Sequence, residues 1–123
     1  MRREEAIQNF RDMWEWMAKQ TEELKRKVTK SEYFQAHNFD ILEIPMHLCF
    51  LCEYANDEYF LHGGDCECDY CPIDFETGEC MGYNREKKRW YIYSEWYYCP
   101  KEDWQKAARL CREIARLPEK EKV

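Results

Sequence analysis

Two pairs of cysteines, each with two residues between its thiols, constrain this chain more than any other feature. The pairs are Cys49 with Cys52 and Cys68 with Cys71, and fifteen residues separate them. Two intervening residues let both sulfurs of a tight turn or helix start face one ion, and two such pairs complete a tetrahedron of thiolates. The spacing therefore predicts one structural zinc ion in a closed four-sulfur site, with iron as the alternative metal.

The exact ligand set stays open because other candidate ligands lie nearby in the sequence. Cys66 could replace Cys68, and Cys80 could replace one member of a pair. His47 or His62 could complete a site of three thiolates and one imidazole, although a surface or core histidine is the commoner role. A second metal bound by the spare thiols and histidines is a further alternative.

The length and the N-terminus indicate the size of the domain and the compartment in which its thiols would bind a metal. A chain of 123 residues suits one small domain with a modest core, which a metal would help to hold. The N-terminus is charged and lacks an apolar run, so we expect neither a secretory signal nor a membrane span. We therefore expect a cytoplasmic protein, in which reduced thiols favour metal ligands over the disulfides that eight cysteines could also form.

A long amphipathic helix is predicted near the N-terminus, from Arg3 to Val28. Its apolar residues recur at intervals of three, four and seven, which places them on one face. We interpret this face as core, although a partner helix could also bind it. The face consists of Ile7, Phe10, Trp14, Met17, Leu24 and Val28.

A second helix is predicted to begin at Pro100, since proline suits a first helical position, and to end near Pro118. Cys111 falls on its apolar face as a core residue. Cys99 lies beside the helix start, where a lowered pKa and a reactive role are conceivable. Residues 87–98 are aromatic and β-branched, which favours a short strand or extended segment. The tail after Pro118 is expected to fray.

Together these patterns predict one mostly α-helical domain, with a small α+β arrangement as the alternative. The domain spans residues 1–123, with a helix over 1–30, an acidic metal-binding segment over 31–84, and an aromatic segment with a helix over 85–118. We expect the two long helices to pack together beneath the metal loop. Their contact residues are expected to be Phe10, Trp14, Met17, Trp104, Leu110 and Ile114.

Charge is distributed unevenly along the chain. Residues 31–84 contain twelve acidic residues and no Lys or Arg, whereas the segments on either side are net positive. Four thiolates on one zinc ion would add further negative charge to the middle segment. Such a field would attract a basic protein surface. The alternative is an acidic surface that is merely solvated.

The cysteine motifs also carry a resemblance. CFLCEYA is followed by CDYCPIDF, by a further cysteine, by an aromatic stretch and by a helix ending in IARLP. This order resembles small cysteine-motif proteins of bacteriophages and prophages, over about residues 45–118. The resemblance implies a metal site at Cys49, Cys52, Cys68 and Cys71, with Cys80 nearby. It also implies a phage context in a bacterial cytoplasm, but no activity, and Cys66 departs from the pattern.

The leading functional hypothesis is a zinc-binding protein that binds a host protein through its acidic face. Inhibitors of host defence systems, including CRISPR effectors, are among the small phage proteins that act in this way. The candidate partner-binding residues are Asp65, Glu67, Asp69, Asp74 and Glu76.

Two other function classes are less well supported. Nucleic-acid binding would have to use the basic C-terminal third, because an acidic metal loop would repel phosphate. Its candidate residues are Arg85, Lys87, Lys88, Arg89 and Trp90 in the stretch REKKRW, which Arg109, Arg112 and Arg116 could extend. An enzyme is not expected, since the sequence lacks the common hydrolase, zinc-protease, phosphate-loop, dinucleotide and deaminase motifs.

Overall fold

The structure is a computed structural model that describes residues 2–45, 48–64, 66–75, 80, 83–86 and 88–121. Helices dominate these residues, and the two described strands have only two residues each, so the predicted mostly α-helical class is confirmed. In chain order the elements are α1 (Arg3–Leu24), α2 (Lys30–Ala36), α3 (Phe50–His62), the 3₁₀ turn η2 (Glu67–Tyr70), β1 (Tyr83–Asn84), β2 (Arg89–Trp90), α4 (Ile92–Tyr97) and α5 (Trp104–Ala115).

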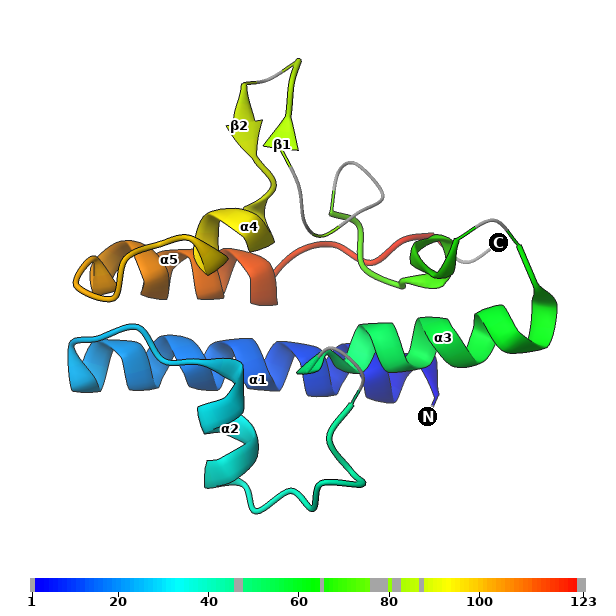
Figure 1. Ribbon diagram of the computed structural model, residues 1–123, viewed down its shortest axis with the longest axis horizontal. Helices are drawn as coiled ribbons and strands as arrows, with labels where there is room; N and C mark the ends of the chain where they lie inside the picture. The colour runs from blue at the N-terminus through cyan, green and yellow to red at the C-terminus, as the bar shows by residue number, and fades with distance from the viewer. Residues whose placement is uncertain are drawn as a thin grey trace.

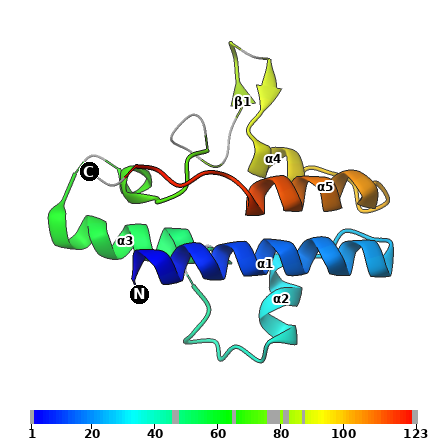
Figure 2. The same cartoon turned by 180° about the vertical axis from the view of Figure 1, so that it is seen from behind.

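Helices α1 and α5, the first and the last described helices in the chain, lie antiparallel along each other's length (Figures 1 and 2). The Arg11 guanidinium on α1 fixes their register, because it donates to the carbonyl oxygens of Ala115 at 3.2 Å and Leu117 at 3.1 Å. Those carbonyls lie at the end of α5, where a helix has unpaired acceptors and a cation is favourable. The predicted packing of the N-terminal helix on the C-terminal helix is therefore confirmed.

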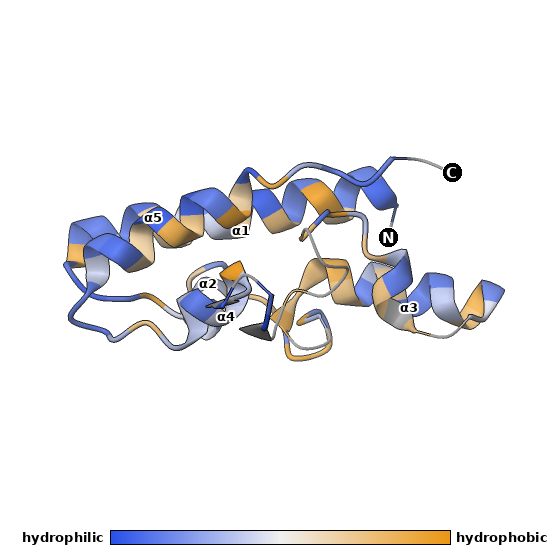
Figure 3. Ribbon diagram, turned by 90° about the horizontal axis from the view of Figure 1, so that it is seen from above, coloured by the Kyte–Doolittle hydropathy of each residue, from blue (hydrophilic) through white to orange (hydrophobic). Residues whose placement is uncertain are grey.

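The core lies between these helices. Hydrophobic and hydrophilic residues alternate along both, as expected of helices with one buried face (Figure 3). Of the six predicted contact residues, Trp104 is the exception, because it occupies the first turn of α5 and stays half-buried. The other five are buried: Phe10, Trp14, Met17, Leu110 and Ile114. Cys111 is fully buried among them, as predicted.

The N-terminal helix is shorter than predicted. It ends at Leu24, and Lys25 follows in the left-handed conformation with φ of 54°. Val28 is nevertheless buried, and its amide donates to the Thr21 hydroxyl at 3.2 Å. Val28 is apolar because the chain turns back onto the core after the helix. The apolar pattern therefore extends four residues beyond the end of α1 and gave too long a helix.

A short helix that the sequence analysis missed, α2, follows this turn. Thr29 caps it: its hydroxyl accepts from the Glu32 amide, while the Glu32 carboxylate accepts from the Thr29 amide. This reciprocal capping box satisfies two amides that the helix itself leaves unpaired. The helix orients Lys30 towards the interior, where its side chain is buried.

The aromatic segment contains the predicted short strand only at Arg89–Trp90, and a helix follows it. β1 and β2 pair Tyr83 with Trp90 and Asn84 with Arg89, and α4 begins directly afterwards at Ile92. α4 packs on α5 and places the Trp96 ring against the Trp14 ring, with 4.8 Å between ring centroids. Tertiary aromatic contacts therefore outweighed the β propensity of this stretch.

The first residues after Pro118 pair with the rest of the fold, where fraying was expected. The Lys120 amide donates to the Pro72 carbonyl and the Asp74 amide donates to the Pro118 carbonyl, both at 2.8 Å. Arg3 on α1 adds an ion pair of 3.0 Å with Glu119. The tail thus joins the second cysteine pair to the helical layer.

Within the described ranges, no helix combines the length and the apolarity that crossing a membrane would require.

Candidate metal centre

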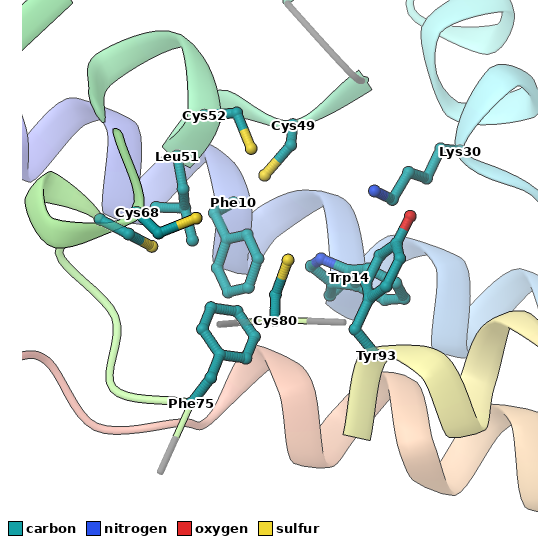
Figure 4. A pocket seen from close by; sticks show the side chains of 11 residues that line it. Phe10, Trp14, Lys30, Cys49, Leu51, Cys52, Cys68, Phe75, Cys80 and Tyr93 are labelled. Atoms are coloured by element: carbon teal, nitrogen blue, oxygen red, sulfur yellow. The ribbon is translucent and has the colours of Figure 1, made fainter. Parts of the chain in front are cut away.

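Five cysteines from separate stretches of the chain line one pocket of about 300 Å³. All four thiols predicted as ligands are among them, together with the predicted alternate at position 80. In Figure 4, Cys49 and Cys52 face the pocket from the start of α3, Cys68 from the η2 side, and Cys80 from a third segment. The complete set is Cys49, Cys52, Cys68, Cys71 and Cys80.

Local structure explains how each pair reaches the pocket. Cys49 is the residue before the first turn of α3 and Cys52 lies within that turn, so both sulfurs lie at one end of the helix. Cys68 and Cys71 are held by the 3₁₀ turn η2, in which the Cys71 amide donates to the Cys68 carbonyl at 3.1 Å. The turn keeps the two thiols on one short loop, as the two-residue spacing predicted.

The other candidate ligands lie elsewhere. Cys66 is exposed, and its sulfur accepts from the Cys68 amide at 3.4 Å as a cap for η2. His62 is exposed at the end of α3, where it lies 3.3 Å from the Glu58 carboxylate. His47 lies outside the described residues.

Apolar side chains form the walls of the pocket. Phe10 and Phe75 meet edge to face with 6.2 Å between centroids, and Leu51 and Trp14 complete the wall. Burial in these surroundings raises the pKa of Cys71 and of Cys80 to about 11. Without a cation to stabilise the thiolates, these two sulfurs would therefore hold their protons.

Cys49 and Cys52 behave as a coupled pair. A hydrogen bond from the Cys52 thiol lowers the pKa of Cys49 to about 6, and the Lys30 ammonium acts in the same direction. The same hydrogen bond, together with burial, raises the pKa of Cys52. The two sulfurs are thus hydrogen-bonded to each other, an arrangement that a metal ion can replace.

Lys30 and Tyr93 close the opposite end of the pocket and were not predicted. The Lys30 ammonium lies 4.2 Å from the centroid of the Tyr93 ring and 5.6 Å from that of Trp14. It points toward Cys49 in Figure 4. Burial lowers the pKa of Lys30, because its charge has lost water. Nothing in the spacing of the cysteines points to a lysine from another helix.

The indole of Trp14 adds a buried donor. Trp14 is fully buried, and its Nε1 has no hydrogen-bond partner among the described residues. In Figure 4 this nitrogen points into the pocket, on the side of Cys80. A buried donor without an acceptor costs about 1–3 kcal/mol, so this position favours an acceptor within the pocket.

The arrangement of the thiols bears on what they could bind. Within the described part of the chain, no group of three or more Cys, His, Asp and Glu side chains has the arrangement needed to hold a metal ion. The sulfurs share a pocket without forming a tetrahedron. Zinc therefore stays a prediction from the spacing.

The predicted partner-binding acids are only partly placed. Asp69 and Asp74 are exposed, as a binding surface requires. Asp65 and Glu76 lie outside the described residues, and Glu67 is described only through the backbone of η2.

The arginines of α5 are paired with acids. Arg112 bonds to Glu22, and Arg116 lies 3.3 Å from Glu15, both across the interface with α1. Arg109 lies 3.8 Å from Glu113 on its own helix. This pairing reduces the positive potential that nucleic acid would require.

The two remaining cysteines lie apart from the pocket. α5 begins at Trp104, so Cys99 does not lie at the positive end of the helix, and the expected lowering of its pKa is wrong. Burial instead raises its pKa, and its thiol donates to the Asp103 carbonyl at 3.5 Å. Burial also raises the pKa of Cys111 to about 12.

No protein-family model matches this chain, and neither does any curated protein or solved structure.

Proposed function

We propose that this chain is a metal-organised binding protein, in which a thiolate metal centre holds α3 and η2 in place so that their outer surface binds a basic protein. The observation that carries the proposal is the convergence of five cysteines from separate segments on one pocket. The spacing predicts one structural zinc ion here. The proposal requires a thiolate-bound metal, whether that metal is a single ion or a larger centre.

The metal centre would stabilise the end of the molecule formed by α3 and η2. The last turns of α3 extend beyond the N-terminus of α1, so they have no helix beneath them (Figures 1 and 2). Tyr70 on η2 supports this end by donating its hydroxyl to the Gly63 carbonyl, and its ring stacks on His62. These contacts alone form a small interface, which a metal bound by both cysteine pairs would reinforce.

The outer surface at this end, which we call the α3 tip, joins apolar and acidic side chains. Phe60 is 79% exposed and Leu61 is 75% exposed. Two adjacent, large and exposed apolar side chains are typical of an interaction surface. Acidic residues flank them, and residues 31–84 contain no Lys or Arg to offset the charge. The α3 tip consists of Asp57, Glu58, Phe60, Leu61 and Asp69.

This composition fits a partner with a basic rim and an apolar centre. An apolar centre supplies most of the affinity of a typical interface, and charge complementarity on the rim increases the association rate. The resemblance to phage proteins makes a host protein, such as a component of a defence system, the first candidate. The paired arginines of α5 favour a protein partner over nucleic acid.

The metal requirement is tested by comparing two cysteine variants. Cys71→Ser removes a thiol from the pocket, and we expect it to lose the metal and to expose residues 48–75 to limited proteolysis. Cys66→Ser is the matched control, since Cys66 is exposed and a serine hydroxyl can also cap η2. Equal metal content and equal proteolysis in both variants would contradict the metal centre.

The surface is tested with charge-neutral variants of equal shape. Asp57→Asn, Glu58→Gln and Asp69→Asn together should weaken binding to a partner isolated from nuclease-treated bacterial lysate at least tenfold, mainly through the association rate. The matched control neutralises three exposed acids elsewhere, Asp12, Glu23 and Glu102. Equal loss in both triple variants, or in neither, would exclude the α3 tip as the binding surface.

A further inference from the structure

The described pocket thiols do not form a group arranged to hold a single ion. A zinc ion bound at about 2.3 Å by four sulfurs requires those sulfurs to lie about 3.8 Å from one another. Five thiols line the pocket, yet the described residues contain no group of three ligands arranged for one ion. The described thiols therefore line one pocket without converging on one ion position.

That volume is large for one ion. The pocket measures about 300 Å³, whereas a water molecule takes a share of about 30 Å³ in the liquid. One ion bound by its thiolates would occupy only a small part of this space.

We propose that the thiol pocket binds an iron–sulfur cluster, held by four of its five cysteines and surrounded by Phe10, Leu51 and Phe75. The inference rests on the proposed metal centre and identifies its contents. In a cluster, each thiolate binds a different iron or shares one with a single neighbour, so the sulfurs need not touch. The inorganic sulfides and irons fill the volume between them.

The charge of such a cluster suits the side chains at the end of the pocket. A cluster bound by four thiolates is anionic, and an anion in an apolar pocket requires a nearby cation or donor. Lys30 is 6% exposed and points toward Cys49, and among the described residues its ammonium lies against the rings of Trp14 and Tyr93. Its buried positive charge is explained if the pocket holds a negative one.

The Trp14 indole provides a second, independent sign of an anionic occupant. Its Nε1 is buried without an acceptor among the described residues and points into the pocket. Cluster and thiolate sulfurs accept hydrogen bonds, and such bonds raise the reduction potential of a cluster. Trp14 is thus a positioning and tuning residue for the cluster, and Lys30 its counter-charge.

Four cysteines are assigned as ligands and one as a neighbour. Cys49, Cys52, Cys71 and Cys80 line the pocket from three segments of the chain. Cys68 is the fifth thiol on the pocket wall, and its carbonyl is held by Lys120 at 3.2 Å. Each ligating thiol releases one proton and forms one S–Fe bond, so binding itself transfers no electrons to or from the protein. The assigned ligands are Cys49, Cys52, Cys71 and Cys80.

The experiment is reconstitution of the full chain without oxygen, from ferrous and ferric iron in equal amounts with inorganic sulfide, alongside a parallel sample given zinc alone. We expect iron and acid-labile sulfide in equal amounts, with more than one iron per chain and broad visible absorption. One zinc or one iron per chain without sulfide would overturn the cluster and leave the metal centre standing. Absence of all bound metal in both samples would overturn both.

Two variants test whether Lys30 and Trp14 act on the cluster itself or only stabilise the fold. Lys30→Met should lower the reduction potential of the cluster, because removing the cation disfavours the more negative reduced state, while iron content stays above one per chain. Trp14→Phe should act in the same direction through the lost N–H donor. Lys19→Met is the control, since Lys19 is exposed. Potentials equal to that of the control would overturn both roles.

Discussion

Lys120 on the C-terminal tail donates a hydrogen bond of 3.2 Å to the carbonyl oxygen of Cys68, fifty-two positions earlier in the chain. The tail therefore supports the 3₁₀ turn that carries the second cysteine pair. The backbone pairing of the tail with residues 72–74 extends this support. A segment whose composition suggests fraying thus contributes to the position of two of the pocket thiols.

Replacing this lysine should loosen the second cysteine pair locally. We expect Lys120→Met to cost about 1 kcal/mol, the typical net value of one hydrogen bond, and to speed hydrogen exchange at the Asp74 amide, which donates to Pro118. Lys106→Met is the control on α5. Unchanged exchange at Asp74 would show that the Lys120 contact does not hold the turn.

The capping box of α2 should give a pH-dependent contribution to stability. A hydrogen bond from Arg26, and another from the Thr29 amide, lower the pKa of Glu32. A carboxyl whose pKa is lowered by folding stabilises the fold above its unfolded value of about 4.3, and this contribution is lost as the pH falls through the lower folded value. Glu32→Gln can keep the capping hydrogen bond but not the charge, so its unfolding free energy should vary less between about pH 5 and pH 3.

Thr29→Ala is the complementary variant. It removes the cap itself and should cost about 1 kcal/mol at neutral and acidic pH alike. Urea unfolding at several pH values separates the two effects. If both variants lost the same stability at every pH, the Glu32 charge would have no separate role.

The long elements were predictable because their signals are local. The apolar stripe of α1 and the pattern around Cys111 on α5 each indicate a helix with one buried face, and α1 and α5 bury each other. The Thr29–Glu32 capping box is also a local sequence motif, and it would have predicted the start of α2. The helix α4 could not be foreseen, because its aromatic residues favour strands until Trp96 packs against Trp14.

The candidate site likewise has features that local sequence predicts and features that depend on tertiary packing. Thiol spacing placed both cysteine pairs correctly on short turns, because two intervening residues constrain the local backbone. The contribution of Lys30, Trp14 and Tyr93 depends on three helices meeting, which no local pattern encodes. The arrangement of the thiols around the pocket depends equally on tertiary packing, because they come from three segments of the chain.

The α1–α5 interface should dominate the stability of the fold. Leu110 on α5 is 1% exposed, so Leu110→Ala should cost about 2–5 kcal/mol through lost burial and the resulting cavity. Leu24→Ala makes the same chemical change at a residue that is 52% exposed, and it should cost less than about 0.5 kcal/mol. Chemical unfolding of both variants tests the comparison, and similar costs would place the core elsewhere.

Cys99 and Cys111, the two buried cysteines outside the pocket, should be chemically inert in the folded protein. The thiolate is the reactive form, and burial raises the pKa of Cys111 to about 12 and also raises that of Cys99. At pH 7.5 the thiolate fraction of Cys111 is then more than about a thousandfold below that of an ordinary thiol, whose pKa is about 8.5. Burial of the sulfur further blocks a reagent.

Alkylation with iodoacetamide followed by peptide mass spectrometry measures this directly. We expect the exposed Cys66 to react first, and Cys99 and Cys111 to react only when urea unfolds the chain. Adding urea below the unfolding midpoint serves as the control for local opening around α4. Labelling of Cys99 as fast as that of Cys66 in the native protein would restore the reactive role that its place near a helix first suggested.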